Sequence, residues 1–228
     1  MKSTDLLTTA AQRLRPLLNE VTFVGGQVAP LLMTVPVITA PRPTKDVDLV
    51  TAATSYTEFG ALERQLTALG LQRDASPGAP ICRWLTPEGI GIDVMPTDPS
   101  TLGFSNRWYP MIVEHAVEYS LTDELTIQIP TAPLYIAAKW EAFLSRGGND
   151  LASHDLEDVI AVVAGRPEIV EETSKAPDEA QRWLAQQLGR FLQDDQADYA
   201  IQGILGYTRP SPDIAQAVTD RLRSLAEL

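Results

Sequence analysis

The sequence predicts an α+β fold, in which a mixed sheet flanked by helices over residues 1–130 is followed by a C-terminal helical bundle over residues 131–228. Short apolar runs bounded by glycine, proline and polar residues, the pattern of β-strands, lie in the first part. In the second part, apolar residues recur with helical spacing to the end of the chain. A chain of 228 residues is long enough for one large domain or two small ones.

The first part is expected to begin with a helix and then to mix strands with helices. Residues 4–19 carry leucines at helical spacing after a Ser/Thr/Asp start, which predicts the first helix. Residues 35–43 contain three prolines and are expected to form a loop. A Pro-Glu-Gly turn at residues 87–89 predicts a hairpin. Strands are expected at residues 21–24, 46–50, 71–73, 81–85, 90–95 and 125–129, and further helices at residues 27–33, 56–69 and 107–119.

The second part is expected to be entirely helical. Its apolar residues follow the i, i+3, i+4 spacing of one helix face in successive segments. These helices are expected at residues 133–145, 154–163, 168–192 with interruptions, and 212–228.

Composition and charge limit the classes of partner. The chain carries 18 basic and 30 acidic residues, for a net charge of −12, which opposes broad nonspecific binding to nucleic acid. Cys82 is the single cysteine, so an internal disulfide is excluded and a reducing compartment is favoured. No segment has the ~18 continuous apolar residues of a membrane span. We therefore expect a cytoplasmic protein with no membrane partner.

Three aspartates on predicted strands form a candidate metal site. Asp46 and Asp48 stand at i and i+2, so their side chains point to the same face of one strand. Asp93 is flanked by aliphatic residues, where an ionised carboxylate is costly unless it lies at a strand end or pairs with a cation. The three converge if their two strands are neighbours, and three such oxygen donors suit Mg²⁺ or Mn²⁺. Each aspartate alone is also compatible with an ordinary surface or strand-end residue.

A glycine pair adds a candidate phosphate site. Gly25 and Gly26 follow an apolar strand, and they would let the backbone approach phosphates at the start of the next helix, although a Gly-Gly pair is more often a simple turn. Together with the aspartates they predict in-line nucleotidyl transfer supported by two metal ions. In that scheme Asp46 and Asp48 bridge the metals. Asp93 holds the metal beside the attacking hydroxyl and assists its deprotonation.

On these residues the sequence resembles the nucleotidyltransferase superfamily with the DNA polymerase beta-like core. Within it, the chain looks most similar to the AbiEii/MenT group of toxin-type nucleotidyltransferases. The resemblance spans roughly residues 20–165 and implies Mg²⁺-dependent transfer of a nucleoside monophosphate from an NTP to a hydroxyl acceptor. It also suggests a toxin role with an antitoxin protein as a partner. The matching segments are Gly25-Gly26, residues 42–48 (RPTKDVD), Asp93, residues 139–146 (KWEAFLSR) and residues 154–160 (HDLEDVI).

The resemblance assigns further residues to the site. Arg42 and Thr44 would bind the nucleotide, with Arg42 as a phosphate or carboxylate clamp rather than a solvated loop arginine. Lys139 would place a positive charge on the nucleotide phosphates, where the alternative is a snorkelling surface lysine. Asp155 would orient Lys139 or a substrate base, where the alternative is a first-turn acid favoured by the helix dipole. The cleft between the two parts is then the predicted active site.

The sequence does not decide among three classes of hydroxyl acceptor, which are an RNA 3′ end, a protein side chain and a small molecule such as an aminoglycoside. The acidic net charge disfavours tRNA and favours a polycationic small acceptor. A different hypothesis is a catalytically inactive nucleotide- or protein-binding module of the same fold. Retention of all three carboxylates argues against it, because an inactive site would be free to lose these costly charges.

Overall fold

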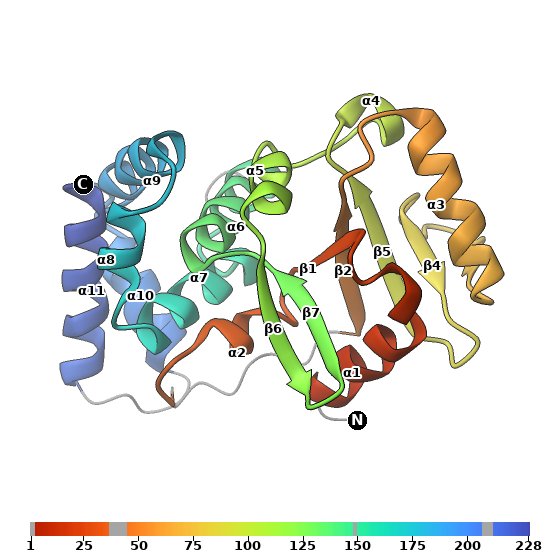
Figure 1. Cartoon of the computed structure of the whole chain (residues 1–228). Helices are drawn as coiled ribbons and strands as arrows, with labels where there is room; N and C mark the ends of the chain where they lie inside the picture. The colour runs from red at the N-terminus through yellow and green to blue at the C-terminus, as the bar shows by residue number, and fades with distance from the viewer. Residues whose placement is uncertain (1–2, 37–44, 148–149, 207–211) are drawn as a thin grey trace. The chain divides into compact units, whose positions relative to one another are not determined.

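The computed structural model describes residues 3–36, 45–147, 150–206 and 212–228 (Figure 1). It confirms the predicted fold class, with a seven-stranded mixed sheet flanked by helices and a separate set of helices. The chain forms two compact units. The first comprises Met1–Val28 and Arg42–Thr131, and the second comprises Ala29–Pro41 and Ala132–Leu228. Residues 29–36, which the sequence placed with residues 1–130, therefore belong with the C-terminal helices.

The first unit contains the whole sheet. Its strands are β1 Val21–Val24, β2 Asp46–Thr51, β3 Gln72–Arg73, β4 Arg83–Leu85, β5 Gly91–Pro96, β6 Val117–Thr122 and β7 Leu125–Ile129. Its helices are α1 Ser3–Arg13, the 3-10 turn η1 Arg15–Leu17, α3 Tyr56–Ala68, α4 Pro99–Leu102 and α5 Tyr109–Glu114. The strand order is β3-β4-β5-β2-β1-β7-β6. The β2/β5 and β1/β7 pairs are parallel and the other neighbours are antiparallel.

The central strands are buried because helices cover them. Every residue of β1 and of β5 is buried, whereas Asp46 and Asp48 of β2 are partly exposed. Helix α1 packs on β2 and β7, and α5 packs on β1 and β2. The predicted hairpin between β4 and β5 is confirmed by their antiparallel pairing and by the turn in which the amide of Gly89 donates to the carbonyl of Thr86.

The second unit consists of helices. They are α2 Ala29–Leu32, α6 Ala132–Gly147, α7 His154–Gly165, α8 Ile169–Ser174, α9 Asp178–Phe191, α10 Ala197–Gly206 and α11 Pro212–Ala226. Helix α2 joins this unit through α7, because the backbone amide of Thr34 donates to the carbonyl of Gly165 at 2.8 Å and Arg166 Nη1 donates to the carbonyl of Leu32. None of the helices in the described ranges combines the length and the apolar character needed to cross a membrane.

Some predicted elements were wrong in extent or type. The helix expected at residues 107–119 is only α5, and the chain then turns into strand β6. The side chains of β6 alternate between exposed and half-buried, so its local pattern is weak and pairing with β7 decides its conformation. The helix expected at residues 27–33 is only the single turn α2. Helix α10 forms in a region, between residues 192 and 212, where no helix was expected.

We predict that the core of the second unit depends on Trp140. Its side chain is 1% exposed, and its ring makes edge contacts with Phe143 and Phe191 at centroid distances of 5.5 and 5.3 Å. Trp140→Ala should lower the free energy of unfolding by about 3–5 kcal/mol in urea denaturation, because it leaves a large cavity. Tyr199→Ala, in the same unit at a side chain 78% exposed, should change it by no more than ~0.5 kcal/mol. Equal effects of the two substitutions would contradict this assignment of the core.

Candidate active site

Parallel pairing of β2 with β5 brings the three predicted aspartates to neighbouring strands. Asp48 lies directly opposite Asp93 in the register, and Asp46 lies opposite Gly91. The alternate residues Val47 and Ile92 are fully buried on the other face, so the carboxylates share one face of the sheet. The strand adjacency on which the sequence hypothesis depended is therefore confirmed.

A fourth charged residue, Arg83 on β4, completes this cluster. Arg83 lies opposite Asp93 in the antiparallel β4/β5 register. Its Nε donates to Asp93 Oδ1 at 2.8 Å and its Nη2 donates to Asp93 Oδ2 at 2.7 Å. The same Nη2 reaches Asp46 Oδ2 at 2.5 Å. We call Asp46, Asp48, Asp93 and Arg83 the triad cluster.

The contacts of Arg83 stabilise its charged form. Its hydrogen bonds to Asp93 outweigh the effect of partial burial, and together with the negative charges of Asp93 and Asp46 they raise the pKa of Arg83. A guanidinium that binds one carboxylate with two nitrogens holds a defined geometry. Sequence reasoning did not single out Arg83, because the signal is non-local: it requires knowing that β4 pairs with β5.

The residue types of the triad cluster fit a divalent cation, but oxygens of Asp93 and Asp46 are engaged with Arg83. Three carboxylates and one guanidinium leave a formal excess of negative charge that a cation such as Mg²⁺ would balance. Within the described ranges, however, no group of three or more His, Cys, Asp or Glu side chains is arranged to hold a metal ion. The predicted metal ligands thus lie on one sheet face, and the metal itself stays a prediction.

Gly25 is required by the space around Asp48. Its φ of +74° lies in the left-handed region, and a Cβ at this position would fall 1.9 Å from Asp48 Oδ2. The backbone after strand β1 therefore passes directly against a triad carboxylate. The following helix α2 has four residues, so it offers little of a helix dipole. Phosphate binding by Gly25 and Gly26 stays a prediction.

Cys82, beside Arg83 in the chain, is not set up as a nucleophile. Burial, followed by the negative charge of Asp93 and then that of Asp48, raises the pKa of its thiol to about 11. The thiol is therefore protonated near neutral pH.

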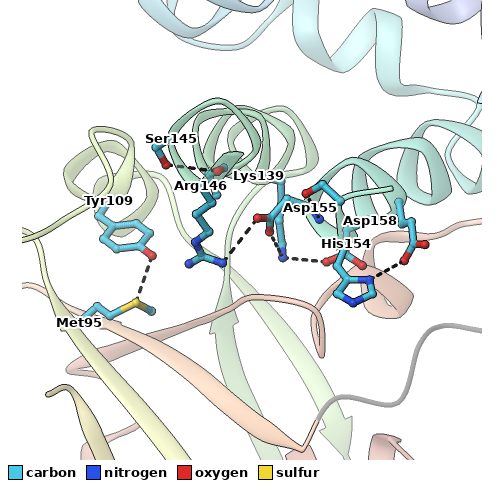
Figure 2. Close-up of polar contacts among 11 residues, drawn as sticks. Met95, Tyr109, Lys139, Ser145, Arg146, His154, Asp155 and Asp158 are labelled. Carbon is cyan, nitrogen blue, oxygen red and sulfur yellow. Dashed lines mark hydrogen bonds and ion pairs between the residues drawn. The ribbon is translucent and has the colours of Figure 1, made fainter. Parts of the chain in front are cut away.

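Lys139 and Asp155 also contact each other, but they belong to the second unit. Figure 2 shows the side chain of Lys139, from α6, between those of Asp155 and Asp158, from α7. Lys139 Nζ lies 2.9 Å from Asp155 Oδ1 and 2.7 Å from Asp158 Oδ2. Arg146 adds a longer contact of 3.5 Å to Asp155 Oδ2. Asp158 was not among the predicted site residues, although its i, i+3 spacing from Asp155 places both acids on one helix face.

The lysine of this cluster stays charged although it is buried. Burial by itself lowers the pKa of Lys139, but the negative charges of Asp158 and Asp155 outweigh that effect and raise it. Its side chain is 15% exposed, so a snorkelling surface lysine does not describe it. Asp155 also occupies the first turn of α7, where its backbone amide donates to Ser153 Oγ at 3.2 Å. The structural and catalytic interpretations of Asp155 are thus compatible.

The predicted site residues therefore fall into three groups. The aspartate triad and the glycine pair lie in the first unit, and Lys139 with Asp155 lies in the second. Arg42 and Thr44 lie outside the described residues. A single active site that draws on both units stays a prediction.

Comparison with known proteins identifies the fold. No family model and no curated protein sequence matches this chain. Among solved structures, the chain is similar to an antigenic nucleotidyltransferase-like protein from Paracoccidioides brasiliensis, with 17% sequence identity and a TM-score of 0.52. The match covers 96% of this chain and 92% of that protein. At this identity the likeness shows the fold alone, which is nucleotidyltransferase-like.

We predict that Gly25→Ala is strongly destabilising because backbone conformation and space both oppose it. A left-handed alanine alone costs about 1–2 kcal/mol, and the contact with Asp48 should add about 1–3 kcal/mol in equilibrium unfolding. Gly78→Ala is the matched control, because Gly78 has φ +83° and a Cβ added there would meet no atom within 4 Å. An equal loss of unfolding free energy in the two variants would show that the added methyl group at position 25 does not clash with Asp48.

We predict that Lys139→Met costs about 3–5 kcal/mol of unfolding free energy at pH 7, because it leaves Asp155 and Asp158 without their buried cation. The stabilisation by Lys139 should be complete below pH 10.5, the pKa of an ordinary lysine, and should fall as the pH rises through its higher folded-state pKa. Arg146→Met, at a side chain 73% exposed, should cost less than ~1 kcal/mol. Urea denaturation of both variants tests this, and a loss below ~1 kcal/mol for Lys139→Met would contradict it.

Proposed function

We propose that this protein is a nucleotidyltransferase that transfers a nucleoside monophosphate from an NTP to a hydroxyl acceptor and releases pyrophosphate. The observation that carries the proposal is the parallel register of β2 and β5, which sets Asp48 beside Asp93 and Asp46 on the same sheet face. Its support from comparison is the nucleotidyltransferase-like fold, which covers nearly the whole chain. A plain scaffold would have no reason to keep three carboxylates together on two central strands.

The roles proposed for the triad follow from its chemistry. Asp46, Asp48 and Asp93 would hold Mg²⁺ or Mn²⁺ through their carboxylate oxygens. When bound, the ion neutralises phosphate charge and polarises the reacting oxygens. Asp93 would accept the proton of the acceptor hydroxyl on a carboxylate oxygen. Gly25, which has no side chain, would leave room for the carboxylate of Asp48 beside the backbone that follows β1.

Lys139 is proposed to balance charge on the nucleotide phosphates, with Asp155 orienting its ammonium group. The contacts of Lys139 with Asp155 and Asp158 support the orientation part of this proposal. An ammonium group has three donors, so its contacts with two carboxylates do not by themselves prevent a third contact with a phosphate oxygen.

The nature of the acceptor and the biological role are also proposals. An RNA 3′ end, a protein side chain and a polycationic small molecule such as an aminoglycoside are the acceptor classes considered. The net charge of −12 supports a cationic acceptor over tRNA. A toxin of the AbiEii/MenT type, with an antitoxin as a partner, is the role that the sequence motifs suggest. An inactive nucleotide-binding module is the second candidate, favoured by the engagement of Asp93 and Asp46 with Arg83.

We predict that incubation with each α-³²P-labelled NTP and Mg²⁺ or Mn²⁺ labels RNA, protein or an aminoglycoside. Asp48→Asn should lower the rate at least ~100-fold, because the neutral amide loses the charge that the ion needs while side-chain size is kept. Asp123→Asn is the matched control, since Asp123 is exposed in the turn between β6 and β7 and should leave the rate unchanged.

Thermal unfolding with each NTP and Mg²⁺ separates the two candidate functions. Stabilisation together with label transfer supports the enzyme. Stabilisation by Mg²⁺–NTP without transfer to any acceptor class would instead favour the binding module, and the absence of both would reject a nucleotide site.

A further inference from the structure

The triad cluster contains its own cation. Arg83 is 24% exposed and Asp93 is 11% exposed at their side chains, so this pair is far more shielded than a typical surface ion pair. Three hydrogen bonds join the guanidinium to the carboxylates of Asp93 and Asp46. Charge-assisted bonds of this kind are the stronger class of hydrogen bond. Arg83 therefore compensates the repulsion that the strand pairing creates.

The backbone positions the guanidinium for this contact. Strand register sets Arg83 opposite Asp93, and two residues further along, on the same face, it sets Gly91 between Leu85 and Asp46. A Cβ at Gly91 would lie 3.6 Å from both Arg83 Nε and Asp46 Cβ. The arginine side chain thus crosses over a residue that has no side chain and reaches a carboxylate two strands away.

We propose that Arg83 is a resident counter-ion that exchanges partners when a metal–nucleotide complex binds. A divalent cation and the guanidinium compete for the same oxygens of Asp93 and Asp46. In this exchange the cation takes the oxygens that Arg83 holds, so the guanidinium needs a new anionic partner in place of Asp93 and Asp46. An arriving triphosphate supplies that partner, because phosphate oxygens match the planar donor fork of arginine.

This exchange makes the binding of metal and nucleotide mutually dependent. Metal displaces Arg83 from the carboxylates, and nucleotide binds the displaced guanidinium, so each ligand should raise the affinity for the other. Arg83 would then act as a gate against metal binding without nucleotide. The inference deepens the proposed nucleotidyltransferase function and rests on it for the identity of the nucleotide, whereas the competition between Arg83 and metal can be measured without catalysis.

Calorimetric titration of Mn²⁺ alone into the full-length protein tests the competition. Arg83→Met should bind Mn²⁺ at least ~10-fold more tightly than the wild type, because a positive charge a few ångströms from the ion is gone. Arg83→Lys keeps the charge without the two-nitrogen fork and should give an intermediate affinity. Arg64→Met, which removes an exposed arginine of helix α3, should leave the affinity unchanged. Equal or weaker Mn²⁺ binding by Arg83→Met, or no binding by either protein at millimolar Mn²⁺, would overturn the proposal.

Thermal unfolding provides a readout if the variant folds poorly. In EDTA, Arg83→Met should melt below the wild type, and Mn²⁺ should raise its Tm by more than it raises that of the wild type. An equal response of the two proteins to Mn²⁺ would mean that Arg83 is only a structural brace and would overturn the exchange.

A second titration tests the coupling. A non-hydrolysable α,β-methylene NTP should tighten Mn²⁺ binding in the wild type and should do so several-fold less in Arg83→Met. An equal gain in both proteins would overturn the role of Arg83 in coupling. If Mn²⁺ binds more tightly to Arg83→Met but no label transfer occurs, the counter-ion stands and the proposed catalysis fails. If transfer occurs and Mn²⁺ affinity is unchanged, the catalysis stands and the counter-ion fails.

Discussion

The pairing of β2 with β5 is the constraint on which the site depends. It sets Asp48 directly opposite Asp93 and puts Asp46 on the same face, so like charges are concentrated on the central strands. Burial of Val47 and Ile92 on the other face prevents a one-residue slip, because a slip would move aspartates into the core. The fold thus holds the carboxylates together against their repulsion.

Two features of the first unit follow from this concentration of charge. Gly25 leaves room for the carboxylate of Asp48, and Arg83 supplies the positive charge that Asp93 and Asp46 require. The second unit shows the same solution, with Lys139 between Asp155 and Asp158. In both units one cation contacts two acids, so each cluster is held by internal ion pairs.

The likeness to a nucleotidyltransferase-like protein and the carboxylate geometry are separate kinds of support. At 17% identity the likeness identifies an architecture, which by itself does not determine activity. The geometry favours a cation-dependent chemistry, because it gathers acidic oxygens on one face of two neighbouring strands. Their agreement is the basis for proposing the triad cluster as the active site.

The sequence by itself determined the local features. The apolar runs predicted β1, β2 and β7, helical periodicity predicted α3, α6, α7 and α9, and the spacing of Asp46 and Asp48 determined that they share a face. These features depend on neighbours along the chain, whose geometry is set by the strand and helix repeats.

Only the tertiary structure decided which distant residues meet. The role of Arg83 depends on the β4/β5 register, β6 forms because β7 pairs with it, and residues 29–36 join the second unit through α7. Asp158 contacts Lys139 because α6 packs on α7. Such pairings join segments far apart in sequence, and no local propensity encodes them, because burial and register are properties of the whole folded chain.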